Sequence, residues 1–305
     1  MTRVEKVAVL GATGSLGEVL IPALRAANFD VTCILRPASK SIIQGVTIKR
    51  AEYTDKEALT LALEGQDAIV EAFNPAAAIH QKQILQAVLA AGVKHIITPD
   101  FSGNTFHPRA EDVLIFNPKI KAQRELEKVV ADSDGKLSWT AIVTGPWYDW
   151  AIEKEIFWVN KEKKVITRHG SGDQRYSISR HALNGEALVA VLKDLDKYKN
   201  RPAYFASHTV STNQLVAIVK DLGLEGWTVV DTPFDGLYQK AHELWQRDTD
   251  NGVQDRLNSK AYEALSTVAL LDQDNRYGSN FESQVEPGWD EGKIALKENL
   301  RKLLS

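Results

Sequence analysis

Cysteine is nearly absent from this chain. Cys33 is the single cysteine among 305 residues, which excludes an internal disulfide, and no Cys-x-x-Cys pair or His/Cys cluster of the kind that binds zinc is present. We expect Cys33 to be a small buried hydrophobe rather than a reactive thiol. The seven histidines include no His-Glu-x-x-His or similar spacing, so the sequence predicts no metal site.

Long apolar segments are missing too. No run reaches the ~20 residues needed to span a bilayer, and the N-terminus shows no basic region followed by a long apolar stretch. The chain also lacks an Asn-x-Ser/Thr acceptor for glycosylation. These absences predict a soluble cytoplasmic protein with no membrane partner.

An excess of positive charge is likewise lacking. Lys and Arg number 37 against 40 Asp and Glu, and no basic stripe with interleaved aromatics is present, so we expect no binding to nucleic acid. The 44% of hydrophobic and 25% of charged residues are ordinary globular proportions. The length suits a nucleotide-binding domain with a smaller lobe, as either a monomer or a homodimer.

Two common catalytic signatures are also absent. None of the eight tyrosines has a lysine four residues later, so the usual proton relay of short-chain dehydrogenases is not expected. The sequence contains no Gly-x-Ser-x-Gly nucleophile elbow. Catalytic chemistry, if present, must come from other residues.

What the chain does contain is a regular alternation of strand-like and helix-like segments. The strand-like segments lie at residues 4–10, 31–35, 46–49, 67–72, 95–98 and 137–144. Parallel strands need crossover connections, so this alternation predicts an α/β fold with a Rossmann-type, doubly wound parallel sheet. Two helix starts are marked, by a capping-box pattern at residues 54–57 and by Asn117-Pro118, where Asn117 is the expected N-cap.

The alternation fades near residue 147. We assign residues 1–147 to the Rossmann domain and residues 148–305 mainly to a smaller α/β substrate-binding lobe, with some later segments expected to return to the sheet. A hairpin is expected around Gly170-Ser171-Gly172.

Aromatic residues gather where the alternation ends. A substrate pocket is mainly apolar, so these residues are candidates for its wall, although core packing is the stronger explanation for each of them individually. The candidates are Trp147, Tyr148 and Trp150, followed by Phe157 and Trp158.

A glycine-rich turn lies between the first strand and the first helix. The turn reads Gly11-Ala12-Thr13-Gly14-Ser15-Leu16-Gly17. Gly11 permits the tight turn, Gly14 lets the backbone approach a pyrophosphate, and Gly17 lets the helix pack close to the sheet. The helix then offers free N–H groups and a positive dipole end, so the turn predicts dinucleotide binding.

The residue that ends the second strand indicates which dinucleotide is bound. Arg36 stands there, and its guanidinium suits a 2′-phosphate, whereas a carboxylate would suit a free ribose hydroxyl. Lys40 lies near enough to add charge. The expected cofactor is therefore NADP(H), with a solvated surface arginine as the alternative interpretation.

Two further strand ends are candidates for the same edge of the sheet. Asn74-Pro75 follows the fourth strand and Thr98-Pro99-Asp100-Phe101 follows the fifth, and either could line the nicotinamide half of the cofactor. Turn-forming residues at strand ends need no such role. Thr54 and Asp55 could approach the adenine, but helix capping explains them.

The helix after the fifth strand carries the remaining candidate. Lys121 falls in its first turns, one residue before the apolar face that begins at Ala122, and Lys119 and Arg124 add like charge. Partial desolvation and like charge both lower an ammonium pKa and improve a proton donor. A solvated helix lysine is the alternative interpretation.

These features together resemble the NmrA-like family of atypical short-chain dehydrogenases. The similarity is nearest to its isoflavone reductase and phenylcoumaran benzylic ether reductase branch, particularly the fungal members, and covers about residues 4–150. It rests on the glycine turn, Arg36, Thr98-Pro99-Asp100-Phe101 and Lys121-Ala122-Gln123-Arg124.

The resemblance implies roles for two residues. In that branch the lysine matching Lys121 is the catalytic acid/base and lies at the cofactor, and the arginine matching Arg36 binds the 2′-phosphate. The branch commonly carries Pro-Ser-Glu/Asp-Phe-Gly where this chain has residues 98–103, so Asp100 and Phe101 are substrate-contact candidates from which plant substrates are not inferred.

Two functional hypotheses follow. The first is an NADPH-dependent reductase that transfers hydride to a conjugated or aromatic small molecule, with Lys121 relaying the proton. The second is a non-catalytic NADP(H) sensor of the NmrA-like type that binds a regulatory protein.

Overall fold

The computed structural model describes residues 3–156 and 158–305, which form two compact units. Unit 1 comprises residues 3–101, Pro118–Ile142 and Asn184–Ala203. Unit 2 comprises the described residues of Ser102–Asn117, Val143–Leu183 and Tyr204–Ser305. The chain therefore passes between the units several times, and no single boundary near residue 147 divides it.

Unit 1 is built on a seven-stranded sheet in the order β10-β6-β5-β4-β1-β2-β3. The strands are β1 (Lys6–Leu10), β2 (Asp30–Leu35), β3 (Thr47–Arg50), β4 (Ala68–Glu71), β5 (His95–Ile97), β6 (Ser138–Val143) and β10 (Arg201–Tyr204). β1 runs parallel to both β2 and β4, and the chain order reverses between β1 and β4. This confirms the predicted Rossmann-type sheet, whose ligands bind outside the carboxyl ends of the strands at such a reversal.

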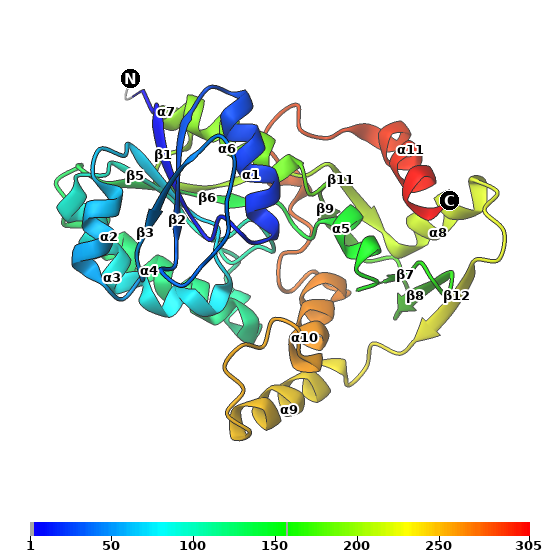
Figure 1. Ribbon diagram of the computed structural model, residues 1–305. Helices are drawn as coiled ribbons and strands as arrows, with labels where there is room; N and C mark the ends of the chain where they lie inside the picture. The colour runs from blue at the N-terminus through cyan, green and yellow to red at the C-terminus, as the bar shows by residue number, and fades with distance from the viewer. Residues whose placement is uncertain (1–2, 157) are drawn as a thin grey trace. The chain divides into compact units, whose positions relative to one another are not determined.

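Helices cover both faces of this sheet (Figure 1). α1 (Ser15–Ala26) and α6 (Leu183–Lys193) pack together, since a Cβ on Gly185 would lie 2.6 Å from the carbonyl oxygen of Val19. The other face carries α2 (Lys56–Leu63), the short helix η1 (Pro75–His80), α3 (Gln81–Ala91) and α4 (Asn117–Ala131), and α7 (Leu195–Tyr198) precedes β10. The core between the layers is aliphatic and includes Leu20, Leu24 and Ile69. Cys33 is fully buried within it, as predicted.

Two helix starts differ from the sequence prediction by one residue. Asp55, rather than Thr54, caps α2, because the Asp55 Oδ1 accepts from the Ala58 backbone N–H at 2.9 Å. Asn117 is the first residue of α4 rather than its N-cap, because the short helix η3 (Leu114–Phe116) runs directly into it. Aspartate and threonine side chains both cap helices well, so the sequence pattern alone does not decide between Asp55 and Thr54.

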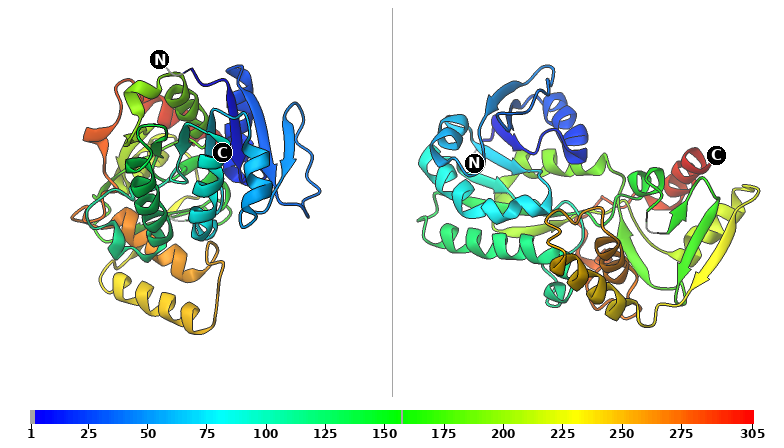
Figure 2. Two further views of the ribbon diagram at one scale, coloured as in Figure 1. Left: turned by 90° about the vertical axis from the view of Figure 1, so that its left-hand side faces the viewer. Right: turned by 60° about the horizontal axis from the view of Figure 1, so that its bottom comes forward.

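Among its described residues, unit 2 contains two small sheets, five α-helices and the short helices η2 (Ala110–Asp112), η3 and η4 (Glu282–Gln284). β9 (Arg175–Ile178) and β11 (His208–Ser211) pair antiparallel, and β8 (Val165–His169) lies between β7 (Val159–Asn160) and β12 (Thr228–Thr232). The helices are α5 (Tyr148–Glu153), α8 (Thr212–Asp221), α9 (Leu237–Asp250), α10 (Lys260–Leu271) and α11 (Gly292–Leu304), and α9 and α10 lie side by side (Figure 2). The predicted hairpin at Gly170 to Gly172 is wrong, because β8 and β9 belong to different sheets.

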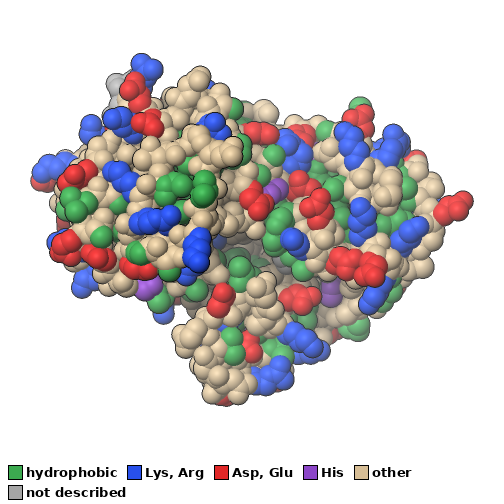
Figure 3. Space-filling model, viewed as in Figure 1, with side chains coloured by type: hydrophobic (Ala, Val, Ile, Leu, Met, Phe, Trp, Pro, Cys, Tyr) green, Lys and Arg blue, Asp and Glu red, His purple; other side chains and the backbone are tan. Residues whose placement is uncertain are grey.

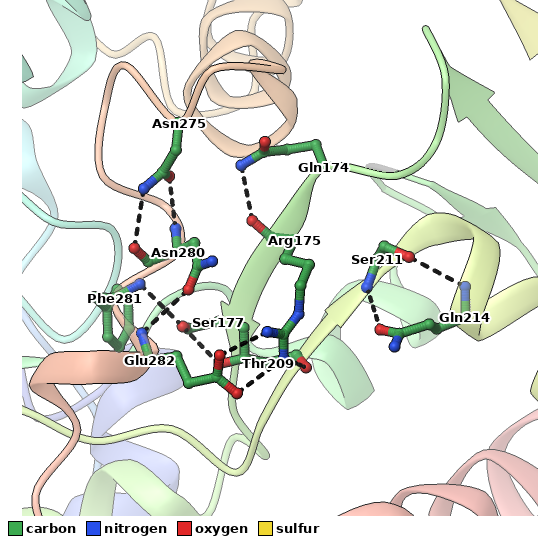
Figure 4. A network of polar contacts seen from close by, with 10 residues as sticks. All are labelled: Gln174, Arg175, Ser177, Thr209, Ser211, Gln214, Asn275, Asn280, Phe281 and Glu282. Carbon is green, nitrogen blue, oxygen red and sulfur yellow. Dashed lines mark hydrogen bonds and ion pairs between the residues drawn. The ribbon is translucent and has the colours of Figure 1, made fainter.

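A polar network fastens the last third of unit 2 to its two-stranded sheet (Figure 4). Arg175 forms a bidentate ion pair with Glu282, with N–O distances of 2.7 and 2.8 Å, and donates to the Thr209 carbonyl at 3.1 Å. Asn275 holds Asn280 through a further pair of hydrogen bonds. These contacts order a segment that has little regular secondary structure.

The surface view in Figure 3 shows acidic and basic side chains interspersed over one face of the molecule. Among the described helices, none combines the length and apolar character required to cross a membrane. Among the described residues, no cluster of three or more His, Cys, Asp and Glu side chains is placed to hold a metal ion.

Candidate functional site

The glycine turn sits at the chain reversal between β1 and β4. Gly11 has a φ of +81°, and a Cβ there would lie 2.5 Å from the carbonyl oxygen of Ala72, directly after β4. A Cβ on Gly17 would lie 2.0 Å from the carbonyl oxygen of Ala12. Both glycines are therefore required by the fold of the turn itself.

Gly14 differs from these two glycines. It is the exposed N-cap of α1, and a Cβ there would meet only the Gly11 carbonyl oxygen, at an ordinary 3.5 Å. Its close neighbours in the predicted site are the exposed Thr13 and the half-buried Ser15 and Leu16. Because a glycine cannot cap with a side chain, the first N–H groups of α1 are left to bind an anion.

Two cations flank the end of β2. The Arg36 and Lys40 side chains are both exposed, and neither forms a hydrogen bond or ion pair with any described residue. Arg50, at the end of β3, donates to the Ser39 carbonyl oxygen at 2.6 Å and so fastens the loop that carries both cations. The arrangement offers unpaired positive charge beside the turn, as a 2′-phosphate requires.

Tyr53 is a member of this region that the sequence reasoning missed. Its phenol meets the backbone of Gly11 and lies near Arg36, and burial raises its pKa to about 12. Its ring centroid lies 5.5 Å from that of Phe73. Tyr53 directly precedes Thr54 and Asp55, the residues that the sequence offers as candidates for the adenine side.

Polar groups after β4 and β5 are buried together. Asn74 caps η1 by accepting from the Ala76 backbone N–H at 2.9 Å. The Thr98 hydroxyl donates to the Asp100 carboxylate at 2.6 Å. Asp100 is 3% exposed and Phe101, which has a φ of +37°, is fully buried. Both proposed substrate-contact residues thus lie inside unit 1 in this structure, and the left-handed backbone at Phe101 is strained.

The two lysines at the start of α4 occupy different environments. The Lys121 side chain is exposed, so the desolvation expected for it is not present. Lys119 is 8% exposed and donates from Nζ to the Asp100 backbone carbonyl oxygen at 2.8 Å. Burial lowers the pKa of Lys119, and the neighbouring Asp100 carboxylate acts in the opposite direction.

Helical spacing is the signal that distinguishes these lysines. Lys119 stands three residues before Ala122 and seven before Leu126, which places it on the apolar face that the sequence revealed. Lys121 directly precedes Ala122 and therefore points elsewhere. Lys119, Ala122 and Leu126 line one narrow gap in the structure.

Glu71 is a second buried ionisable group that the sequence reasoning did not single out. It ends β4, is fully buried, and neither carboxyl oxygen has a hydrogen-bond partner among the residues that the structure describes. Burial raises its pKa to about 8; the nearby Gln81 amide lowers it somewhat and Asp100 raises it further. No sequence pattern indicates its burial, because a glutamate at a strand end is ordinarily solvated.

The aromatic candidates belong to unit 2. The Trp147 ring stacks on His181 with a centroid distance of 4.7 Å and meets Trp150 edge-on at 5.7 Å, and both tryptophans are half-buried. Tyr148 is 1% exposed within the hydrophobic core, and its hydroxyl accepts from Asn299 at 3.0 Å. Trp158 shares that core.

These packing contacts divide the predicted aromatic set. Core packing is the role that the structure shows for Tyr148 and Trp158, whereas Trp147 and Trp150 keep exposed surface. Phe157 lies outside the described residues.

The fold and the turn define a Rossmann-type α/β protein, and comparison with known proteins gives its family. The model of the NmrA-like family matches residues 3–137. The oxidoreductase aprR from Aspergillus flavus is 32% identical over 231 residues, covering 73% of this chain and 76% of that protein. The chain belongs to the NmrA-like family, which confirms the resemblance inferred from the sequence.

The isoflavone reductase branch is a more distant relation. An isoflavone reductase homologue from Arabidopsis thaliana is 23% identical over 237 residues, covering 71% of this chain and 74% of that protein. The solved structure of AtPrR2 with NADP+ and (+)pinoresinol matches with a TM-score of 0.74 at 15% identity, over 99% of each chain. That structural likeness shows the shared fold.

Proposed function

We propose that this protein is an NADPH-dependent reductase that transfers hydride to a conjugated or aromatic small molecule, with a buried lysine as general acid/base. The observation that carries the proposal is the position of Lys119. Its ammonium is buried at the carboxyl edge of the sheet that also bears the glycine turn, and the Asp100 carbonyl holds it. Burial lowers the pKa of Lys119, which makes its ammonium a better proton donor than an exposed lysine.

The residues at the turn fit a dinucleotide phosphate. Gly14 leaves the helix N-terminus uncovered, and the Arg36 guanidinium is exposed beside it without an ion-pair partner in the described chain. The name oxidoreductase given to aprR and the NADP+ in AtPrR2 support the same assignment. When bound, the cofactor supplies the hydride.

The chain's own contribution is the proton. Lys119 holds it at Nζ, which lies 2.8 Å from the Asp100 backbone carbonyl oxygen, and donates it to the substrate atom that gains electron density. Lys121, the candidate from the sequence, carries the same charge at the surface of the same helix. It therefore serves as a matched control for Lys119.

The substrate class is proposed on two grounds. AtPrR2 binds pinoresinol, an aromatic molecule, and the half-buried Trp147 and Trp150 of unit 2 offer the kind of ring surface that aromatic ligands contact. The Asp100 carboxylate is buried and accepts a hydrogen bond from the Thr98 hydroxyl. Asp100 therefore enters the proposal as the residue whose backbone carbonyl oxygen holds Lys119, rather than as a substrate contact.

The test is turnover of NADPH by the purified protein with a panel of conjugated aromatic ketones, quinones and benzylic ethers. We expect substrate-dependent loss of nicotinamide absorbance with at least one class, and tighter binding of NADPH than of NADH in calorimetry. Tight NADPH binding without turnover across the panel would instead support the sensor hypothesis. Equal affinity for both nucleotides would contradict the assignment of Arg36.

A further inference from the structure

Glu71 is the buried charged group that the proposed reaction leaves without a use. It lies at the carboxyl end of the central strand β4, where the sheet reverses its chain order, and no solvent reaches it. A buried carboxyl whose oxygens meet no hydrogen-bond partner among the described residues is costly to the fold. Such a group calls for a physical explanation.

The groups that face Glu71 come from four other parts of unit 1. Lys119 and Gln123 of α4 and Gln81 of α3 line the same narrow gap as Glu71. Asp100 follows β5 and acts electrostatically on both Glu71 and Lys119. The Tyr53 phenol is the remaining titratable neighbour, and its pKa is raised as well, so it stays uncharged near neutral pH.

Within this set, Lys119 is the only cation that shares the gap with Glu71 in the described part of the chain. Burial raises the pKa of Glu71 to about 8 and lowers that of Lys119. Both shifts bring the proton affinities of the two groups closer together than those of an exposed glutamate and an exposed lysine. The remaining lining residues are Thr98, Pro99, Ala122 and Leu126.

We propose that Glu71 is the positioning residue that sets the charge of Lys119 across the gap that both side chains line. Loss of the proton from the Glu71 carboxylic acid and gain of a proton by the Lys119 amine give a carboxylate and an ammonium, with no net change of charge inside the gap. The ammonium so formed is the proton donor for the reaction, and solvent restores the proton after turnover. The inference rests on the proposed function, since it assigns to Glu71 control of that reaction's acid.

The first test is the pH dependence of kcat for Glu71→Gln, which keeps the shape of the side chain and removes its charge. Without a carboxylate partner Lys119 loses its proton more easily, so the alkaline limb of the profile should move to lower pH by about 0.5–1 unit. Glu125→Gln, on the exposed side of α4, is the control and should leave the profile in place. Superimposable profiles for Glu71→Gln and the unmodified enzyme overturn the proposal.

The second test measures folding stability and does not depend on enzymatic activity. The folded-state pKa of Glu71 lies above its ordinary value of 4.5, so the protonated carboxyl favours the folded state at low pH, and that stability is lost as the pH rises from about 4.5 to about 8. Chemical denaturation across this window should show the loss in the unmodified protein and not in Glu71→Gln. Lys119→Met should steepen the loss, because the carboxylate then has no cation.

The double variant Glu71→Gln/Lys119→Met completes a double-mutant cycle. If Glu71 and Lys119 are coupled, the two single changes in denaturation midpoint will not add at pH 8. Additive changes overturn the proposal even if Lys119→Met is inactive. An active Lys119→Met enzyme with non-additive midpoints contradicts the catalytic lysine while keeping the pair. Glu71→Leu provides a second charge-free variant should the glutamine form fold poorly.

Discussion

The carboxyl edge of the sheet in unit 1 has two halves, and charged side chains are exposed in one half and buried in the other. Around β1, β2 and β3 the charged groups are exposed: Arg36 and Lys40 point into solvent and the helix N-terminus at Gly14 is open. Around β4 and β5 they are buried, with Glu71 and Lys119 sharing a narrow gap. Exposed cations suit recognition of phosphate, whereas desolvated groups change pKa and suit proton transfer.

The largest expected effect separates the two lysines of α4. Lys119→Met keeps most of the apolar stem but removes the proton, so turnover at saturating NADPH should fall by about 10²–10⁴, or roughly 3–5 kcal/mol of barrier. Lys121→Met alters an exposed side chain and should change turnover by less than about threefold. Stopped-flow measurement of nicotinamide absorbance with one substrate compares both variants directly.

The opposite ranking would restore the assignment made from the sequence. If Lys121→Met loses turnover and Lys119→Met does not, the buried lysine is structural. Both variants should bind NADPH in calorimetry, which guards against a damaged cofactor site that imitates a lost proton donor.

The contrast between the two halves also explains what the sequence could predict. A glycine at φ +81° and an arginine after a strand are local features, so the sequence alone predicts the turn and makes Arg36 a candidate. The environment of Lys119 depends on Asp100 and on α3, which are distant in the chain. Glu71 is buried by tertiary packing, and the sequence of the four-residue strand β4 does not indicate that burial.

The second prediction divides the glycines of the turn by role. Gly17→Ala places a Cβ 2.0 Å from the Ala12 carbonyl oxygen, so the free energy of unfolding should fall by about 1–3 kcal/mol or more. Gly14→Ala meets nothing closer than 3.5 Å and should cost less than about 1 kcal/mol, the expense of alanine at an N-cap.

The effect on cofactor affinity should have the reverse order: among folded proteins, Gly14→Ala should weaken NADPH binding more than Gly17→Ala. Gly14→Ala should weaken NADPH binding by about tenfold or more, because the new methyl group stands where the phosphates approach the helix. Urea denaturation and calorimetry measure the two effects separately. A Gly14→Ala protein with unchanged affinity would place the phosphates elsewhere.

The third prediction concerns the exposed half alone. Arg36→Ala removes a charge-assisted contact worth roughly 1.5–3 kcal/mol, so the preference for NADPH over NADH should narrow by about tenfold or more. Lys40→Ala should narrow it less, because an ammonium at the end of a mobile stem is a weaker partner for phosphate than a guanidinium fork. Titration with both nucleotides gives the ratio. An unchanged ratio in Arg36→Ala would mean that the guanidinium is a solvated surface group.

The smallest effect tests whether the exposed half is held in place before the cofactor arrives. Arg50 donates to the Ser39 carbonyl oxygen at 2.6 Å, so its guanidinium fixes the loop on which Arg36 stands. Because one exposed hydrogen bond contributes about 0.5–1.5 kcal/mol, Arg50→Ala should weaken NADPH binding by only about two- to tenfold. The loss should nearly vanish in an Arg36→Ala background, since a well-placed loop has little value without its guanidinium. Arg50→Lys keeps the charge with a shorter reach and should resemble the alanine variant. If it instead restores full affinity, or if the loss persists without Arg36, then Arg50 acts on the phosphate through its own charge, and both halves of the edge depend on direct contact alone.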